Sequence, residues 1–283
     1  MMPVVAIVAP GNMGAAVARR LNEHGVQILT TLSGRSFGSE TRAASAGMHA
    51  VPLESLADAD FVLSILPPSA ALSFAEQMGP ALANAARKPV FVDCNAVSPA
   101  TVRRIGAVIS ATNTPFVDAG IIGSPPAPGK PGPRFYASGE SAPRFAALGE
   151  HGIDVHVLDG PVGAASALKL SFAGINKGLV AVGTAMILAA TRNGADQALL
   201  AELAAHWPTL HAPLQRQIPG MLPKAYRWVG EMQEIAAFVG DDSAVKDIFL
   251  GAARLFERIS SDLEEDGPET TALLKFFARE HPR

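Results

Sequence analysis

The sequence predicts an α/β fold, in which a doubly wound parallel sheet is followed by a long helix and an all-α C-terminal domain. Apolar runs of strand length alternate with Ala-rich segments of helix length, which is the rhythm of such a sheet. The alternation stops after about residue 160, and a helical pattern without proline then covers 163–192, ending at Asn193-Gly194. We therefore expect one domain over 1–162 and another over 163–283.

Each expected strand is a short apolar run. The strands are expected at 4–8, 27–32, 61–65, 90–92 and 116–117. In the second domain, Pro208, Pro213, Pro219 and Pro223 are expected to divide the chain into segments, because proline disfavours helix at the residue before it. The clearest helices there cover 224–239 and 243–260.

Composition excludes several classes of protein. With 283 residues, 48% hydrophobic and 17% charged, the chain can bury a large core in two domains. A net charge of -3, without a block of Lys and Arg, argues against nucleic-acid binding. No signal pattern and no charge-free stretch long enough to span a membrane is evident, so we expect a cytoplasmic protein. The single Cys94 cannot form an internal disulfide, and the histidines lack metal-ligand spacing, so no metal site is expected.

A turn after the first strand resembles a dinucleotide-binding fingerprint. Ala9-Pro10-Gly11-Asn12-Met13-Gly14 stands where G-x-G-x-x-G would stand, with only the first glycine replaced. Gly11 would let the backbone approach a pyrophosphate, and Gly14 would let the helix pack closely on the strand. The sequence therefore predicts a Rossmann-type domain, although an ordinary strand-turn-helix with incidental glycines is the alternative.

The end of the second strand favours NADP over NAD. An acidic residue that would bind the ribose hydroxyls of NAD is missing, and Ser33-Gly34-Arg35-Ser36 stands in its place. Arg35 can hold a 2′-phosphate by a forked contact, with Ser33 and Ser36 as hydroxyl donors. The alternative is that Arg35 is a solvated loop arginine.

Several segments together resemble one enzyme family. They share the order seen in the β-hydroxyacid dehydrogenases, relatives of 6-phosphogluconate dehydrogenase: Asn12-Met13-Gly14, Ser33-Gly34-Arg35-Ser36, Leu66-Pro67-Pro68-Ser69, Val92-Asp93-Cys94-Asn95, Phe116-Val117-Asp118-Ala119 and Gly163-Ala164-Ala165-Ser166-Ala167-Leu168-Lys169. The resemblance covers the first 180 residues well. The C-terminal helices, with Arg227-Trp228-Val229-Gly230-Glu231-Met232, resemble a poorly characterised branch of this superfamily.

The resemblance implies an active site in a cleft between domains, and a dimer built by the helical domain. It implies that Leu66 and Pro67 skirt the cofactor ribose and that Asn95 lies near the nicotinamide, where its amide could bond cofactor and substrate. It also suggests that backbone near Gly123 and Ser124 holds a substrate anion. A Lys-Asp pair at Lys246 would face the cleft, although a solvated helix face is an equal alternative.

Lys169 stands at the family's catalytic position. Oxidation of an alcohol needs a base and carbonyl reduction needs an acid, and a lysine whose pKa falls from about 10.4 toward 7 or 8 can serve as both. Helical spacing surrounds it with small and apolar residues, which is a desolvated setting. The alternative is a lysine that extends to the surface from an interdomain helix.

Two positions depart from the family pattern. Ala173 replaces an asparagine that contacts substrate, and Ile122 replaces a substrate-binding serine. Asn176 lies on nearly the same face but seven residues after Lys169, about 10 Å further along the helix axis, so it is no simple substitute. These changes suggest a substrate bulkier or less acidic than a small hydroxy acid.

We therefore expect an NADP-dependent oxidoreductase of the β-hydroxyacid dehydrogenase type, acting on a 3-hydroxy acid or a related alcohol or carbonyl compound. Two alternatives remain, an imine reductase on the same scaffold and a non-catalytic NADP-binding protein whose helical domain binds a partner. The sequence names neither the substrate nor the direction of the reaction.

Overall fold

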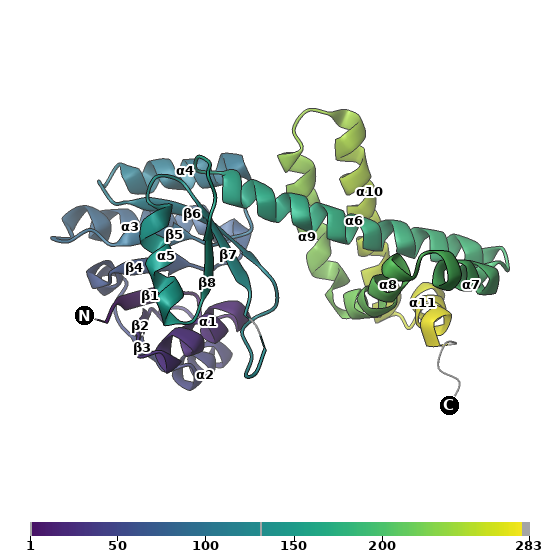
Figure 1. The fold of residues 1–283 in the computed structure, drawn as a ribbon, viewed down its shortest axis with the longest axis horizontal. Coiled ribbons are helices and arrows are strands. Elements are labelled where there is room, and N and C mark those ends of the chain that lie inside the picture. The colour runs from purple at the N-terminus through teal and green to yellow at the C-terminus, as the bar shows by residue number, and fades with distance from the viewer. Residues whose placement is uncertain (1, 131, 279–283) are drawn as a thin grey trace. The chain divides into compact units, whose positions relative to one another are not determined.

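The computed structural model of the chain describes residues 2–130 and 132–278 (Figure 1). The chain forms two compact units, Met1–Leu170 and Ser171–Arg283. The division falls within helix α6 (Ala164–Arg192), whereas the sequence suggested a boundary at residue 162. The long helix itself matches the predicted span 163–192 closely.

The first unit contains an eight-stranded sheet with the strand order β3-β2-β1-β4-β5-β6-β7-β8. The strands are β1 (Val4–Val8), β2 (Gln27–Thr30), β3 (Met48–Ala50), β4 (Phe61–Ser64), β5 (Val90–Asp93), β6 (Phe116–Ile122), β7 (Arg134–Ser138) and β8 (Asp154–Val157). Strands β1 to β6 pair in parallel, which confirms the doubly wound sheet. The sequence did not predict β3, nor β7 and β8, of which β7 runs antiparallel to β6.

Helices cover both faces of this sheet, so the first unit has two cores. Successive side chains of a strand point to opposite faces. Val5 and Ile7 of β1 accordingly join one core with α1 (Asn12–Glu23), α2 (Phe37–Ser45) and α5 (Ala142–Ala146). Ala6 and Val8 join the other core with η1 (Glu54–Asp58), α3 (Pro68–Asn84) and α4 (Pro99–Ser110). The remaining short helix is η2 (Ala147–His151). Burial on both faces explains why these strands are continuous apolar runs.

The second unit is helical. Besides the later part of α6 it contains α7 (Asp196–His206), α8 (Pro208–Met221), η3 (Leu222–Lys224), α9 (Ala225–Phe238), α10 (Ser243–Glu264) and α11 (Pro268–Ala278). Helices α9 and α10 are the two that the sequence predicted. Close approach to α6 depends on its glycines, since a Cβ on Gly174 would lie 3.3 Å from side-chain atoms of Ile235 and Phe249.

The prediction that prolines divide this unit is wrong for α8. Pro213 and Pro219 both lie inside that helix, while Pro208 occupies its first turn, where a missing N–H costs nothing. Each internal proline removes one helical hydrogen bond. Leu214, Ile218 and Met221 are nevertheless buried along one face of α8, so packing outweighs the local penalty.

Helix α6 is long and apolar enough to cross a membrane when length and composition alone are considered, with a mean hydropathy of 1.5 over an 18-residue window. No other helix in the described part of the chain passes this test. Core helices of soluble proteins pass it too, so it does not by itself identify a membrane segment. Cytoplasmic localisation remains a prediction.

Candidate active site

The turn between β1 and α1 has the geometry of a dinucleotide-binding turn. A Cβ on Gly14 would collide with the carbonyl oxygen of Ala9, so this glycine is required for close packing of α1 on β1. A Cβ on Gly11 would meet no atom within 4 Å, so the backbone there is open to a ligand. Gly11 also gives α1 no side-chain cap. Together these features leave the start of α1 suited to an anionic pyrophosphate.

The turn between β2 and α2 carries the residues predicted to select NADP, Ser33, Arg35 and Ser36. Gly34 adopts a left-handed conformation (φ 68°), and the N–H of Arg35 donates to the carbonyl oxygen of Leu32 at 3.0 Å. Ser36 stands at the N-cap of α2. Arg35 is half-buried, whereas Ser33 and Ser36 are exposed, so their hydroxyls are accessible to a ligand.

Arg42 links this turn to the fingerprint, and the sequence did not suggest it. Its Nε donates to the carbonyl oxygen of Pro10 at 3.0 Å, and its Nη2 donates to the hydroxyl of Ser39 at 3.0 Å. Ser39 and Ser36 in turn share a hydrogen bond of 3.2 Å. Arg42 stands seven residues after Arg35, which precedes α2. This spacing is the only feature of the sequence that could have suggested a role for Arg42. Both guanidinium groups therefore belong to the α2 side of the dinucleotide turn.

A hollow of about 600 Å³ adjoins the same turn. It lies at the carboxyl ends of β2 and β3, and its walls are partly polar and partly apolar. Its lining residues are Thr31, Leu32, Ser33, Ala50, Val51, Pro52, Leu53 and Glu54.

A row of buried polar residues crosses the carboxyl ends of the parallel strands. Ser64 pairs with Asp93, Asp93 pairs with Asp118, and Asp118 pairs with Ser138 of β7. Paired residues on adjacent strands face the same side of a sheet. All four are at most 1% exposed. On the other side of β4, Ser64 also pairs with Val8, so the row ends at the strand that leads into the fingerprint turn.

Asn95 follows β5 and joins two strands. Its Oδ1 accepts the N–H of Leu66 at 2.5 Å, and its Nδ2 donates to the hydroxyl of Ser64 at 2.8 Å. The side chain is 2% exposed. The amide therefore fixes the start of the Leu66-Pro67 loop, which the sequence placed near the cofactor ribose. Direct contact of Asn95 with cofactor or substrate remains a prediction.

Asp93 is a buried carboxyl group with an unusual pKa. Burial raises this pKa from 3.8 to about 6, against the lowering effect of hydrogen bonding with Asn95. Its Oδ1 accepts the N–H of Asn95 at 2.9 Å, while Oδ2 is buried without a hydrogen-bond partner in the described part of the chain. Asp118 raises this pKa further, and the positive charge of Lys169 lowers it. Lys169 is thus close enough to Asp93 to interact electrostatically.

Lys169 lies in the second turn of α6, against β6. A Cβ on Gly120 would lie 3.1 Å from the Cβ of Lys169 and 2.8 Å from the carbonyl oxygen of Ala165. The side chain of Asp118 accepts four hydrogen bonds from the start of α6 and a fifth from the hydroxyl of Ser138 on β7. The expectation of small and apolar surroundings therefore omitted two buried carboxyl groups. Their negative charges favour the ammonium form of Lys169.

The remaining predicted residues are more dispersed. Gly123 follows β6 with φ 128°, and a Cβ there would lie 3.0 Å from the Cα of Pro133. Ser124 is exposed next to it. Lys246 lies in the first turn of α10, in the second unit, and is exposed. Roles of these three residues in substrate binding stay predictions. Within residues 2–130 and 132–278, no three His, Cys, Asp or Glu side chains gather into a metal site.

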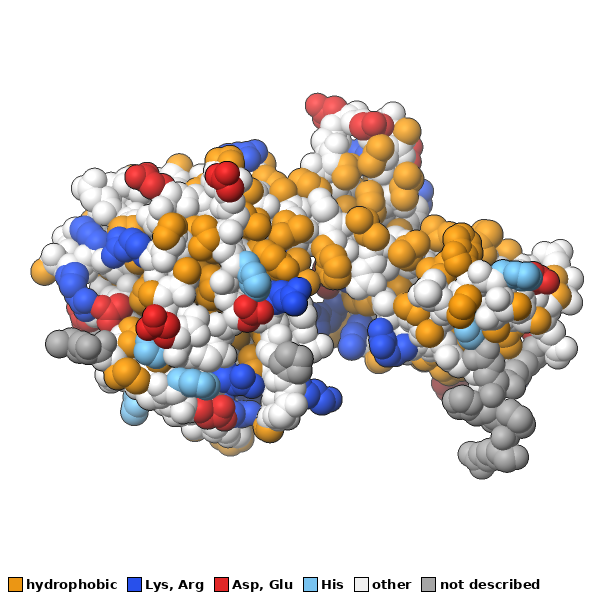
Figure 2. All heavy atoms as spheres, in the orientation of Figure 1, with side chains coloured by type: hydrophobic (Ala, Val, Ile, Leu, Met, Phe, Trp, Pro, Cys, Tyr) orange, Lys and Arg blue, Asp and Glu red, His pale blue; other side chains and the backbone are white. Residues whose placement is uncertain are grey.

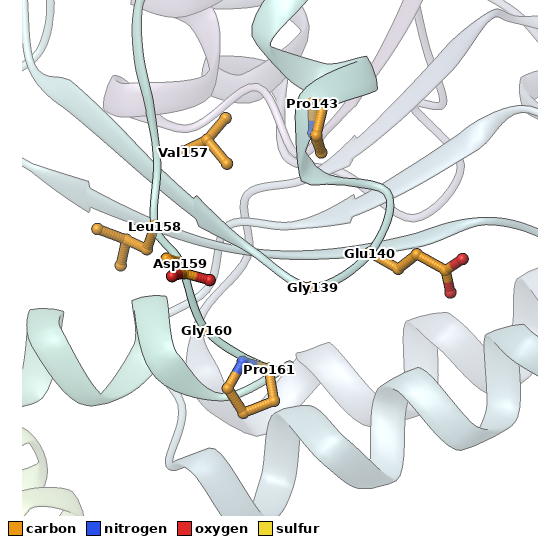
Figure 3. Close-up of a pocket in the computed structure, with 8 residues that line it drawn as sticks. All are labelled: Gly139, Glu140, Pro143, Val157, Leu158, Asp159, Gly160 and Pro161. Carbon is orange, nitrogen blue, oxygen red and sulfur yellow. The ribbon is translucent and has the colours of Figure 1, made fainter.

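A second hollow, of about 620 Å³, lies between the loop after β7 and the segment that leads to α6 (Figure 3). Glu140 and Asp159 contribute carboxylates to it, and its described lining includes no cation. Because an anionic dinucleotide needs positive or N–H donor groups, this hollow does not suit the cofactor. None of the residues predicted from sequence lines it.

Comparison with known families agrees with this geometry. Residues 4–165 match the NAD binding domain of 6-phosphogluconate dehydrogenase, and residues 190–259 match a domain of unknown function, DUF1932. The first match covers more than half of the chain. The chain belongs to the 6-phosphogluconate dehydrogenase NAD-binding family. An uncharacterized 28.5 kDa protein of Methanothermus fervidus is 30% identical over 159 residues, which span 56% of this chain and 59% of that protein.

Solved structures of this family type align over nearly the whole chain. A conserved protein of unknown function, described as structurally similar to 3-hydroxyacid dehydrogenases, is 26% identical over 94% of this chain and 100% of its own, with a TM-score of 0.75. The 3-hydroxyisobutyrate dehydrogenase of Mycobacterium tuberculosis is 19% identical over 97% and 99%, with a TM-score of 0.68. An imine reductase of Myxococcus stipitatus in complex with NADP+ shares the fold at 16% identity over 98% of this chain and 99% of its own, with a TM-score of 0.59.

The family resemblance that the sequence suggested is therefore confirmed. The family and the fold are those of NAD(P)-dependent oxidoreductases of the hydroxyacid dehydrogenase type.

Proposed function

We propose that the protein is an NADP-dependent oxidoreductase acting on a 3-hydroxy acid or a related alcohol or carbonyl compound, with Lys169 as the general acid/base. One observation carries the proposal: α6 holds Lys169 against Gly120 of β6, beside the buried carboxyl row that reaches the carboxyl edge of the sheet, where β5 ends level with β4 and β1. The fingerprint turn follows β1 at that same edge. Ligands of open α/β sheets bind at this edge, where the strand order reverses.

The positive charges on the α2 side support NADP as the cofactor. Arg35 and Arg42 both lie there, and neither forms an ion pair with a carboxylate in the described part of the chain. A 2′-phosphate is a doubly charged acceptor that suits forked arginine contacts. The hollow beside Ser33 has partly apolar walls, and its volume of about 600 Å³ lies within the range of small-molecule sites, which suits the adenosine end of the cofactor.

In the proposed reaction the cofactor handles the hydride and the protein handles the proton. When bound, the nicotinamide supplies or accepts the hydride. The ammonium group of Lys169 protonates the carbonyl oxygen during reduction, and the amine removes the hydroxyl proton during oxidation. Asn95, by bonding Leu66 and Ser64, holds the loop that borders the cofactor. Gly123 and Ser124 offer backbone N–H groups to a substrate anion.

The proposal is tested with a panel of substrates, and turnover of each is monitored by the absorbance of the nicotinamide. Purified protein is assayed with 3-hydroxy acids, the corresponding aldehydes and ketones, and cyclic imines, each with both NADP and NAD forms. We expect NADP-linked turnover of an alcohol or carbonyl compound that is lost in Lys169→Met while NADPH still binds. Lys224→Met, an exposed lysine of the second unit, is the control and should retain activity.

Other results would overturn parts of the proposal. Turnover of imines alone, or full activity in Lys169→Met, would refute lysine acid/base catalysis on an alcohol. Tight NADPH binding without any turnover would indicate a non-catalytic binding protein. An Arg35→Ala variant that keeps its preference for NADPH over NADH would refute the assignment of the 2′-phosphate site.

We also propose that the helical unit forms a homodimer through α6. Five large apolar side chains of α6 are between 48% and 68% exposed, and their spacing of three and four residues aligns them on one face. They are Phe172, Ile175, Leu179, Val182 and Met186. Figure 2 shows hydrophobic side chains gathered over this helix. Such a continuous exposed apolar row is typical of an interface.

Sedimentation of the purified chain tests the dimer. We expect a mass of two chains for the wild type and of one chain for Ile175→Glu. Leu274→Glu, an exposed apolar residue of α11 outside the row, should leave the dimer intact. A monomeric wild type, or a dimer that Ile175→Glu does not weaken, would refute the interface.

A further inference from the structure

The start of α6 is bound by one carboxylate from a neighbouring strand. Oδ2 of Asp118 accepts the N–H groups of Gly163 at 2.8 Å, Ala165 at 3.1 Å and Ser166 at 3.1 Å. Oδ1 accepts the hydroxyl of Ser166 at 2.6 Å, and the hydroxyl of Ser138 donates to Oδ2 at 2.9 Å. Asp118 is fully buried. Charge-assisted bonds of this kind are short and directional, so the first turn cannot rotate or slide without breaking several of them.

A second contact lies one turn further along the helix. Gly120 is two residues after Asp118 on β6, so both face the same side of the sheet. A Cβ at Gly120 would come within 2.8 Å of the carbonyl oxygen of Ala165 and 3.1 Å of the Cβ of Lys169. Real Cβ atoms keep a greater distance from backbone oxygen. Gly120 therefore sets how closely the backbone that carries Lys169 approaches the strand.

We propose that Asp118 and Gly120 are positioning residues for Lys169: the carboxylate fixes the rotation and axial position of α6, and the glycine fixes its distance from β6. The inference rests on the proposed role of Lys169 as the acid/base. Lys169 is three residues after Ser166 and four after Ala165, so it stands directly above the bound turn. Any shift of that turn therefore moves the lysine, because only one helical turn separates them.

Gly106, which is about as crowded as Gly120, provides a control. Its substitution separates an effect on the position of Lys169 from a general loss of stability. Gly106 of α4 faces Phe116, the first residue of β6, and a Cβ there would lie 3.0 Å from the ring. Gly106→Ala therefore strains the same strand without touching α6. Gly120→Ala and Gly106→Ala should both lower the thermal-unfolding midpoint, but only Gly120→Ala should move Lys169.

The first measurement needs no cofactor and no substrate. Cofactor-free protein is labelled with acetic anhydride over a range of pH, and peptides carrying Lys169 and Lys88 are quantified by mass spectrometry. Lys88, whose ammonium donates to the carbonyl oxygens of Leu82 and Ala83, is the internal reference. We expect Gly120→Ala to change the labelling rate of Lys169 relative to Lys88, and Gly106→Ala to leave it unchanged. In Asp118→Asn the labelling midpoint should move to lower pH, because a nearby negative charge is lost.

The second measurement is steady-state kinetics on the substrate found in the turnover panel. Misplacing a catalytic group by about 1 Å can cost about 10²-fold in rate, so the smaller shift forced by Gly120→Ala should lower kcat about tenfold. The KM for NADPH should stay within about twofold, because the fingerprint turn is untouched. Ser166→Ala, which removes a single donor to Asp118, should show a smaller loss of kcat.

The outcomes separate this inference from the proposed function. Unchanged labelling of Lys169 in Gly120→Ala, or equal kcat in Gly120→Ala and Gly106→Ala, would refute positioning even if Lys169→Met is inactive. Altered labelling in Gly120→Ala together with a fully active Lys169→Met would leave the structural link in place and refute the catalytic role instead. If Asp118→Asn does not fold, Gly120→Ala and Ser166→Ala still decide the question.

Discussion

Replacing Asp93 with asparagine should stabilise the protein at neutral pH. Asp93 is buried, one of its oxygens has no hydrogen-bond partner in the described part of the chain, and burial raises its pKa from 3.8 to about 6. Its other oxygen accepts the N–H of Asn95, and asparagine can keep that bond. The substitution therefore removes a buried charge while it preserves the shape of the residue.

The size of the effect follows from the two pKa values. A carboxyl whose pKa is higher in the folded state favours folding while it is protonated, below pH 3.8. That stabilisation is lost as pH rises through about 6. The difference corresponds to about 3 kcal/mol, at about 1.4 kcal/mol for each pH unit. Asparagine does not ionise, so Asp93→Asn should gain about 3 kcal/mol over the wild type between pH 4 and pH 8.

Urea unfolding of both proteins at several pH values measures this gain. The difference between the two free energies of unfolding cancels every titrating group that does not interact with Asp93. We expect it to rise between pH 4 and pH 6.5 and then to level off. A difference that is independent of pH, or that favours the wild type increasingly as pH rises, would refute the buried ionised carboxylate.

Three further predictions concern the cofactor side. Arg42→Ala should raise the dissociation constant of NADPH about tenfold, through loss of a charged hydrogen-bond donor, with a smaller change for NADH in fluorescence titrations; equal changes would contradict a phosphate role. Gly14→Ala should lower the thermal-unfolding midpoint, whereas Gly11→Ala should leave it unchanged and weaken NADPH binding, and identical behaviour of the two would contradict the fingerprint geometry. Asn95→Ala should cost about 1–3 kcal/mol in urea unfolding by leaving buried groups unsatisfied, and a neutral effect would contradict its bridging role.

The parallel strands and the long helix were predictable because their signals are local. Val4–Val8 is apolar at every position, since both of its faces are buried, and 163–192 has no proline. Strand β7 was missed because Arg134–Ser138 is not a continuous apolar run; its short alternation of polar and apolar residues stands just after a loop rich in proline and glycine. Helix α8 was missed because Pro213 and Pro219 are local breakers, and only the buried face of that helix compensates for them.

The positions of candidate site residues were predictable where they follow a motif, and their roles remain predictions. Gly11, Gly14 and Lys169 could be placed from the sequence because each follows a recognisable turn or helix start. Asp93 and Asp118 belong to segments that resemble the family. The sequence assigned them no role, because their pairing depends on strand register. Register depends on packing between strands that lie far apart in the sequence, so no local sequence pattern predicts it.

Transfer of deuterium from labelled cofactor tests the central claim most directly. NADPH carrying deuterium at both C4 positions of the nicotinamide is incubated with the substrate from the turnover panel and with wild type or Lys169→Met, and the mass of the product is measured by mass spectrometry. The account predicts a product heavier by one deuterium with the wild type and none with Lys169→Met. An unlabelled product, or transfer by Lys169→Met at the wild-type rate, would contradict it.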